Sequence, residues 1–349
     1  EPLDSRFRGN DSNLGEPNPH LRLAMKDAKS KRSALRQRLK SGKLLVAPGA
    51  HNGLSARLVQ EAGFEAVYMT GSGVANTLTG GADVGLLTMS EMTMMARFMA
   101  QAADDIPVIS DADTGYGNAI NVIRTVREFE LTGIAGIHIE DQVSPKRCGS
   151  IAGKEVIPID EACGKIRAAA DARTDPDFLI IARTDARGAV GFDDAVARGK
   201  AYADAGADMI VPDALLSVDE YESFANEVPG PKLFNMGGYA KKRTTPKLPL
   251  QQVEDMGYAV CILPLLALRA GVQAMIDTLA GFKQDGIDYE LRQLEAFNDQ
   301  PVENWYEFTG IAAIRDLEDR YMPKDTIEQR YAGTAGHKPG DKDNVRGME

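Results

Sequence analysis

The stretch "FLIIARTDARGAVGFDDAVARGKAYADAGADMIVPDA", residues 178–214, decides the fold class of this chain. It opens with a short apolar run, "FLIIA". A longer segment with a helical pattern follows, "FDDAVARGKAYADAG". A second apolar run, "ADMIVP", closes the stretch. This order of strand, helix and strand predicts a βα unit followed by the next strand of a parallel sheet.

The same unit repeats along most of the chain. Eight apolar runs alternate with helical patterns, at residues 44–49, 65–73, 107–115, 134–142, 178–186, 207–214, 232–238 and 258–264. Several helical patterns begin at a residue suited to cap a helix, such as Ser90 or Asp160, and several end at glycine. Eight units predict a (β/α)8 TIM barrel, whose active sites lie at the C-terminal ends of the strands. An open doubly wound sheet is the alternative, but "GSGVAN" (71–76) is only a fragment of its phosphate-binding pattern.

The barrel is expected to cover residues 31–285. Residues 1–30 read as a disordered extension, polar and rich in Pro, Gly and Asn, without the apolar region of a secretory signal. Met25 is an alternative start. A basic helix is predicted within "KDAKSKRSALRQRLKSGK" (26–43), and its charges are expected to form a solvated face. C-terminal helices are predicted over 286–325 and a flexible tail over 326–349.

The composition limits the classes of partner. The 349 residues include 40 basic and 51 acidic side chains, a formal net charge of −11, so no global positive field attracts nucleic acid or an anionic membrane. No apolar run approaches the length of a membrane span. The three cysteines cannot all pair within one chain and have no metal-ligand spacing, which favours a reducing cytoplasm. Small anionic substrates remain open, because they respond to local charge.

Polar residues follow the predicted strands at the end where a barrel has its active site. They include Tyr68, Ser72, Gly73, Asp111, Asp113, His138, Glu140, Asp141, Arg183, Asp185, Asp213 and Asn235. Carboxylates from adjacent strands repel one another unless a cation joins them, and oxygen ligands favour Mg2+ or Mn2+. Asp111 and Asp113 are the best candidates, because residues i and i+2 of an extended strand point to one side. Alternatively, Asp141 and Asp185 cap helices or pair with Arg183, and Asp83 is a turn residue.

One cysteine differs in its surroundings from the other two. Cys148 lies in "HIEDQVSPKRCGSIAGK" (138–154), a loop of polar residues and glycines, where Lys146 and Arg147 would favour its thiolate. Cys163 lies in a helical pattern and Cys261 in an apolar strand, so both are predicted to be small buried hydrophobic residues. Cys148 is therefore the functional candidate.

Three motifs on consecutive predicted strands carry a family resemblance. "DADTGYG" (111–117), "HIEDQ…PKRCGS" (138–150) and "ARTDA" (182–186) resemble the isocitrate lyase/phosphoenolpyruvate mutase superfamily, over about residues 30–325. The resemblance implies a (β/α)8 barrel that is often a homotetramer, with a C-terminal helix exchanged between subunits. The segment "VENWYEFTGIAAIRDLEDRYMP" (302–323) suits that helix. It could equally pack on its own barrel.

The resemblance also implies roles for individual residues. Asp111, Asp113 and Glu140 match the metal shell, partly through waters, with Asp83 of "GGADVG" as a further contributor. Arg183 and Asn235 match substrate-binding residues. The segment expected to hold a 2-oxo acid comprises Tyr68, Ser72, Gly73 and Val74, and the mobile gating loop comprises Cys148, Gly149 and Ser150.

Within the superfamily, the chain resembles the short lyases that act on 2-methylisocitrate and 2,3-dimethylmalate. The implied reaction is Mg2+-dependent cleavage of a 2-hydroxy di- or tricarboxylate to a 2-oxo acid such as pyruvate and a second carboxylate. In this reaction the Cys148 thiol protonates the leaving fragment, Tyr68 is a candidate base and Arg183 stabilises developing charge. Serine at position 150 departs from the histidine common in these lyases. It cannot carry a positive charge and favours a smaller or less charged substrate, such as a 2-alkylmalate.

Other activities stay open at this point. The same superfamily includes enzymes that decarboxylate or hydrolyse oxaloacetate, and enzymes of phosphonopyruvate or phosphoenolpyruvate. Mutases that resemble this chain generally carry Asn in place of Cys148, which favours the lyases. A barrel that binds an oxo acid without turnover is a further alternative.

Overall fold

The computed structural model describes residues 27–237, 245–298 and 300–337. The chain divides into two compact units, Lys26–Val272 and a second unit whose described part begins at Gln273. The division falls inside helix α11 (Leu266–Asp285). Most of the predicted N-terminal extension, residues 1–26, lies outside the described residues.

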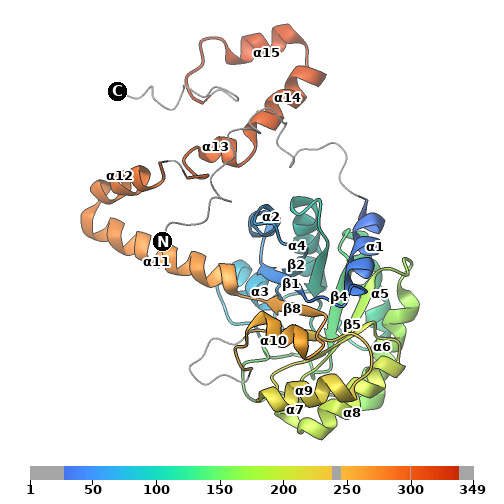
Figure 1. Ribbon diagram of the computed structural model, residues 1–349. Coiled ribbons are helices and arrows are strands. Elements are labelled where there is room, and N and C mark those ends of the chain that lie inside the picture. Colours follow the sequence, from blue (N-terminus) through green and yellow to red (C-terminus); the bar gives the residue numbers. More distant parts are fainter. Residues whose placement is uncertain (1–26, 238–244, 299, 338–349) are drawn as a thin grey trace. The chain divides into compact units, whose positions relative to one another are not determined.

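Eight parallel strands form the centre of the first unit (Figure 1), in the order β6-β5-β4-β3-β2-β1-β8-β7. A parallel bridge between Ile210 and Lys232 connects the two end strands, so the sheet closes into a nearly complete barrel. The predicted (β/α)8 barrel is confirmed and the open doubly wound alternative is wrong. The strands are β1 Leu45–Ala50, β2 Val67–Met69, β3 Val108–Asp111, β4 Gly136–Glu140, β5 Leu179–Thr184, β6 Met209–Pro212, β7 Leu233–Asn235 and β8 Val260–Leu263.

Helices follow the strands and surround them. They are α2 Gly53–Glu61, α3 Gly71–Thr79, α4 Met89–Ala102, α5 Ala119–Leu131, α6 Ile159–Ala172, α7 Ala186–Ala189, α8 Phe192–Asp204, α9 Val218–Glu227 and α10 Leu250–Asp255. Their N-termini differ in detail from the expected caps. Thr88 caps α4 in a capping box with Glu91, and Pro158 precedes α6. Ser90 and Asp160 therefore lie inside the first turns, because Thr88 and Pro158 provide the helix starts.

The apolar side chains divide into an inner and an outer layer. The inner cluster fills the barrel and includes Tyr68, Ile109, Ile181 and Met209. The outer cluster lies between the strands and the helices. Cys163 and Cys261 are buried free thiols, as predicted.

Helix α1 (Ala28–Leu39) lies at the N-terminal ends of the strands and adds Leu35 to the inner cluster. The expectation of a solvated charged face is wrong for two of its residues. Lys31 and Arg32 are each only 4% exposed. The Arg32 guanidinium donates to the main-chain oxygen of Ile134 at 2.9 Å and binds Asp175 at 3.0 Å. Burial is tolerated because each charge is hydrogen-bonded to groups that precede the strands.

The second unit contains helices only, among the residues described. After α11 come α12 Ile287–Ala296, α13 Trp305–Phe308, α14 Ile311–Tyr321 and α15 Lys324–Tyr331. The single helix expected at 302–323 is two helices, because Gly310, at φ 96°, separates α13 from α14. Helix α15 crosses the predicted start of the tail at residue 326. Exchange of a helix between subunits stays a prediction. None of the helices in the described ranges combines the length and apolar character needed to cross a bilayer.

Candidate active site

A cavity of about 230 Å³ opens at the C-terminal ends of the strands. Nine of the predicted site residues line its wall, namely Tyr68, Ser72, Asp83, Asp111, Cys148, Gly149, Ser150, Arg183 and Asn235. They come from strands β2, β3, β5 and β7, from helix α3, from the segment between α3 and α4, and from the loop that follows β4. The barrel therefore gathers residues that are up to 167 positions apart in the sequence, from Tyr68 to Asn235.

Two predicted substrate residues lie behind this wall rather than on it. The main-chain N–H of Gly73 donates to the Thr70 hydroxyl at 3.1 Å, and that of Val74 donates to the Thr70 carbonyl at 2.9 Å. Both N–H groups therefore serve the start of α3, and the Val74 side chain belongs to the outer core cluster. Only Tyr68 and Ser72 of the predicted four-residue segment reach the cavity.

The "DADTGYG" turn does not continue the strand, contrary to the expected i, i+2 arrangement. Strand β3 ends at Asp111, and Asp113 has a left-handed backbone with φ 46°. Aspartate tolerates this conformation better than most residues. The Asp113 N–H donates to Asp111 Oδ1 at 2.9 Å, and the Asp113 carbonyl accepts from the Glu140 N–H at 2.9 Å. The two carboxylates are thus placed by a turn fastened to strand β4.

Lys146 lies among these carboxylates. Its ammonium is 2.7 Å from Asp83 and 2.8 Å from Asp113. Burial opposes the charge, but the neighbouring carboxylates of Asp113, Glu140 and Asp111 raise the pKa of Lys146 well above its ordinary value. The lysine therefore balances part of the negative charge for which the sequence predicted a metal ion.

Cys148 follows Lys146 by two residues and lines the cavity, half-buried. Lys146 lowers the pKa of the thiol, as expected, but other effects outweigh it. Burial raises the pKa of the Cys148 thiol, because removal from water disfavours the anion, and the Asp83 carboxylate adds to this effect. The thiol is therefore protonated at neutral pH.

The loop that carries the cysteine is fastened on several sides. The Gln142 side chain donates to the Arg147 carbonyl at 2.8 Å and accepts from the Arg147 N–H at 2.9 Å. The Cys148 N–H donates to the Asp83 carbonyl at 3.1 Å. On the far side of the cysteine, the Gly149 carbonyl accepts from the Lys154 ammonium at 2.8 Å. These contacts place the thiol over the cavity.

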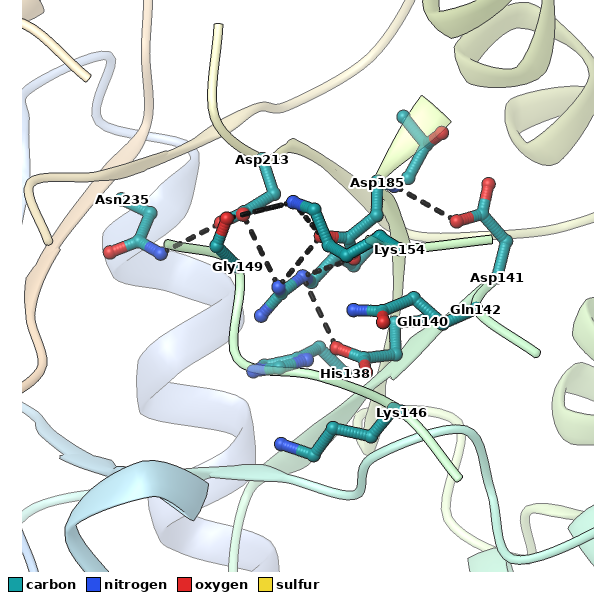
Figure 2. A network of polar contacts seen from close by, with 12 residues as sticks. His138, Glu140, Asp141, Gln142, Lys146, Gly149, Lys154, Asp185, Asp213 and Asn235 are labelled. Atoms are coloured by element: carbon teal, nitrogen blue, oxygen red, sulfur yellow. Dashed lines mark hydrogen bonds and ion pairs between the residues drawn. The ribbon is translucent and has the colours of Figure 1, made fainter. Parts of the chain in front are cut away.

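Arg183 is the centre of a second charged group. Its Nε and Nη2 atoms bind the two oxygens of Asp185 at 2.9 and 3.0 Å, so the predicted alternative pairing of these two residues is confirmed. Glu140 and Asp213 each lie 3.3 Å from the guanidinium. Figure 2 shows Asn235 beside Asp213, and its amide donates to the Asp213 carboxylate at 2.9 Å. Although burial opposes both charges, the ion pairs raise the pKa of Arg183 and lower that of Asp185.

Tyr68 lines the cavity and forms a buried polar pair with His138. The Tyr68 hydroxyl lies 2.5 Å from His138 Nε2, and His138 Nδ1 lies 3.7 Å from Asp111 Oδ1. Burial raises the pKa of Tyr68 well above its ordinary value and lowers that of His138. Both rings are therefore neutral at neutral pH, and Nε2 is the natural acceptor for the phenolic proton.

The donor chemistry suits a hard cation, although no three His, Cys, Asp or Glu residues in the described ranges are gathered closely enough to hold one. Both carboxylate oxygens of Glu140 are buried and accept no hydrogen bond from any described group, although Oε2 forms an ion pair with Arg183 Nε at 3.3 Å. Burial raises the pKa of Glu140 well above its ordinary range, despite the opposing effect of Arg183. Asp111 lines the cavity directly. Buried oxygens that lack a donor are the ligands that Mg2+ would satisfy.

Several site residues were missed by sequence reasoning. Lys154, Thr70 and Thr245 all contribute to the site, and Lys146 was considered only for its effect on the cysteine. Lys154 is the last residue of the loop stretch quoted above, but its role depends on side chains that follow two other strands. No local pattern in the sequence could have identified it.

Comparisons with known proteins identify similar sequences and structures. Residues 35–283 match the family described as Phosphoenolpyruvate phosphomutase. The chain is 42% identical to 2,3-dimethylmalate lyase of Eubacterium barkeri, over 82% of this chain and 96% of the relative. It is 44% identical to probable 2-methylisocitrate lyase 2 of Corynebacterium glutamicum, over 78% and 92%. A crystal structure of 2,3-dimethylmalate lyase superposes with a TM-score of 0.77 and 34% identity, over 90% of this chain and 100% of that one.

Proposed function

This chain belongs to the phosphoenolpyruvate phosphomutase family, and on that premise we propose that it is a carbon–carbon lyase of 2-hydroxy dicarboxylates. The supporting observation is the position of Cys148, a protonated thiol on a loop that lines the same cavity as Arg183 and Asp111. The Cys148 thiol can donate a proton, and Arg183 in the same cavity can bind a substrate carboxylate. This combination suits a reaction that ends in protonation of a carbanion. The lyases among the relatives favour the same reaction class.

The proposed substrate is a 2-alkylmalate such as 2,3-dimethylmalate. Cleavage between C2 and C3 gives pyruvate and propionate: the C2 hydroxyl loses a proton to the protein and the propionate carbon gains one from it. A proton then passes from His138 to Cys148 through solvent and returns the site to its starting state. Ser150 on the cavity wall supports a dicarboxylate, because a neutral hydroxyl provides no charge for a third carboxylate. Tricarboxylates of the 2-methylisocitrate type are the alternative substrates.

The first proton transfer involves Tyr68 and His138. We infer that Tyr68 takes the C2 hydroxyl proton as its own phenolic proton passes to His138 Nε2, 2.5 Å away. A free phenolate is not needed, which agrees with the raised pKa of Tyr68. The imidazolium that forms lies 3.7 Å from the Asp111 carboxylate, which stabilises its charge.

The second proton transfer is from Cys148. As the C2–C3 bond breaks, its electron pair passes to the departing enolate, and the Cys148 thiol donates a proton to the former C3 carbon. The high thiol pKa makes the sulfur a donor rather than a nucleophile at neutral pH. Arg183, buried among Glu140 and Asp213, holds the substrate carboxylate on which negative charge increases.

We further propose Mg2+ as the cofactor, with Mn2+ as a substitute. Asp111, Asp113 and Glu140 would hold it, with Asp83 contributing through water. When bound, the cation supplies Lewis-acid stabilisation of the oxygen that loses its proton. Lys146 would have to leave Asp83 and Asp113, because its ammonium is within 2.8 Å of both.

A substrate panel tests the proposal. The full chain with Mg2+ is incubated with 2,3-dimethylmalate, 2-methylisocitrate, isocitrate, oxaloacetate and phosphonopyruvate, and the release of 2-oxo acid, oxalate or phosphate is followed. We expect pyruvate from 2,3-dimethylmalate, and loss of turnover when Asp111→Asn replaces the proposed metal ligand. Turnover of phosphonopyruvate or oxaloacetate alone would overturn the lyase assignment. Removal of Mg2+ with a chelator, followed by calorimetric titration, tests the cofactor independently of turnover.

The setting and assembly of the enzyme are also proposals. Three free thiols agree with a reducing, cytoplasmic compartment. A homotetramer is supported by exposed apolar side chains along α12, including Ile287, Leu291 and Leu294 at helical spacing. Light scattering coupled to size exclusion measures the mass directly, and a mass of one chain would reject the oligomer.

A further inference from the structure

We propose that Lys154 is a positioning residue that latches the Cys148 loop to strands β5 and β6. The inference rests on the proposed function only for its catalytic consequence, because the latch itself follows from geometry. Lys154 lies after the loop, and Figure 2 shows its side chain between Gly149, Asp185 and Asp213. Its side chain is only 5% exposed, so the contact is sheltered from water.

The three contacts come from three different segments. The Lys154 ammonium donates to the Gly149 carbonyl at 2.8 Å and to Asp185 Oδ1 at 2.8 Å, and it lies 3.7 Å from Asp213. Asp185 follows β5 and Asp213 follows β6, whereas Gly149 is the residue directly after the cysteine. One ammonium group therefore joins the loop that carries Cys148 to the ends of two barrel strands.

The close packing at Gly149 shows how tightly this point is held. A methyl group added at Gly149 would lie 1.9 Å from an Asp213 oxygen and 2.8 Å from Arg183 Nη2. The loop backbone therefore rests directly on the Arg183–Asp213 ion pair. Lys154 holds the Gly149 carbonyl beside that ion pair. Lys154 and Arg183 both bind the Asp185 carboxylate.

The latch has two consequences. It fixes the sulfur of Cys148 over the cavity, because the neighbouring peptide is held. It also links loop closure to the arginine that binds substrate, since Arg183 and Lys154 use the same Asp185 carboxylate. Without the ammonium, the Gly149 carbonyl loses its charged donor, while the bonds between Gln142 and Arg147 and from the Cys148 N–H to Asp83 remain.

Alkylation of Cys148 tests the latch without substrate. Full-length wild-type protein, K154M and K154R are treated with iodoacetamide in the presence of a chelator, and labelling of each cysteine is followed by mass spectrometry. K154M should label Cys148 faster by about tenfold, the factor expected for loss of one charge-assisted hydrogen bond. K154R should restore slower labelling. The K154M ratio should persist at a pH where the thiol is fully ionised in wild type and variant, because a change in thiol pKa alone would no longer affect the rate there.

Matched controls are present in the same chain. Lys232→Met removes another buried lysine, one that binds the main-chain oxygens of Ala225 and Val228 away from the cavity. It should leave Cys148 labelling unchanged. Equal labelling of wild type and K154M would overturn the latch, as would a parallel rise at Cys163 and Cys261, which would indicate general loosening.

Kinetics then separate the latch from the proposed reaction. With the substrate identified by the panel, K154M should lower kcat more than it changes KM, because the thiol is misplaced and the binding groups remain. If no 2-hydroxy acid is cleaved by wild type, the lyase proposal fails, yet the labelling result still decides the latch. An unchanged kcat in a variant with fast labelling would limit Lys154 to a purely structural role.

Discussion

The Tyr68 hydroxyl and the His138 imidazole share a hydrogen bond of 2.5 Å inside the barrel, with Asp111 3.7 Å from the other imidazole nitrogen. The two rings come from β2 and β4, the strands on either side of β3, and lie nearly parallel at 8°. A phenol whose pKa is raised by burial becomes a useful base only if its own proton has an acceptor. His138 provides that acceptor.

Tyr68→Phe should therefore cut turnover by about 10²- to 10⁴-fold, the usual contribution of a general acid–base group, with little change in substrate binding. The ring remains to pack against His138, so the fold should persist. Steady-state kcat and KM are the measurements. Tyr258→Phe is the control, because Tyr258 is an equally buried tyrosine whose hydroxyl donates to the Tyr221 carbonyl away from the cavity. Undiminished turnover in the Tyr68 variant would exclude the relay.

Cys148 should titrate above the ordinary thiol pKa of about 8.5. Its alkylation rate, measured with a chelator present, should rise with pH to a midpoint above that value. The same cysteine in urea should titrate near the ordinary value. Between the two midpoints the folded chain binds more protons than the unfolded chain, so this group makes the free energy of unfolding fall as pH rises. A folded-state midpoint at or below the unfolded one would contradict the proton-donor assignment.

Lys146→Met should increase the affinity for Mg2+ by at least about tenfold, since one positive charge near the carboxylates is removed and competition ends. The lysine is held by Asp83 and Asp113, both proposed to face the cation. Isothermal titration of chelator-treated protein gives the dissociation constant. Asp111→Asn is the control that should abolish binding. Weaker binding in the lysine variant would show that Lys146 assists the cation rather than replacing it.

Arg32→Met should lower the free energy of unfolding by about 3–5 kcal/mol, because it leaves the buried Asp175 carboxylate without its partner. The substitution also removes the hydrogen bond to the Ile134 carbonyl, which lies just before strand β4. Urea unfolding measures the change. Arg124→Met removes a surface cation 3.8 Å from Glu128 and should change stability by less than about 1 kcal/mol. Similar effects of the two substitutions would mean that α1 does not brace the barrel.

Local sequence patterns were sufficient to predict the fold and many residues of the cavity wall. They did not predict which lysines pair with the carboxylates of the site. Alternating strands and helices place Tyr68, Asp111 and Arg183 at one end of a barrel by topology alone. The conformation of Asp113 depends on a left-handed turn that its sequence allows without requiring it. The partners of Lys146 and Lys154 lie on other strands, so their positions follow from side-chain packing in three dimensions.

Ser150 is the residue most directly linked to the choice of substrate, because it lines the cavity on the same loop as Cys148 and is exposed there. Ser150→His should raise kcat/KM for 2-methylisocitrate relative to 2,3-dimethylmalate by about tenfold, the worth of a charge-assisted hydrogen bond to the extra carboxylate. Imidazole is charged only below a pKa of about 6.5, so the gain should be larger in mildly acidic than in mildly alkaline buffer. Ser150→Asn offers a neutral donor of similar reach and separates charge from hydrogen bonding. Equal gains in the two variants, or a gain that does not depend on pH, would show that position 150 acts through shape rather than charge.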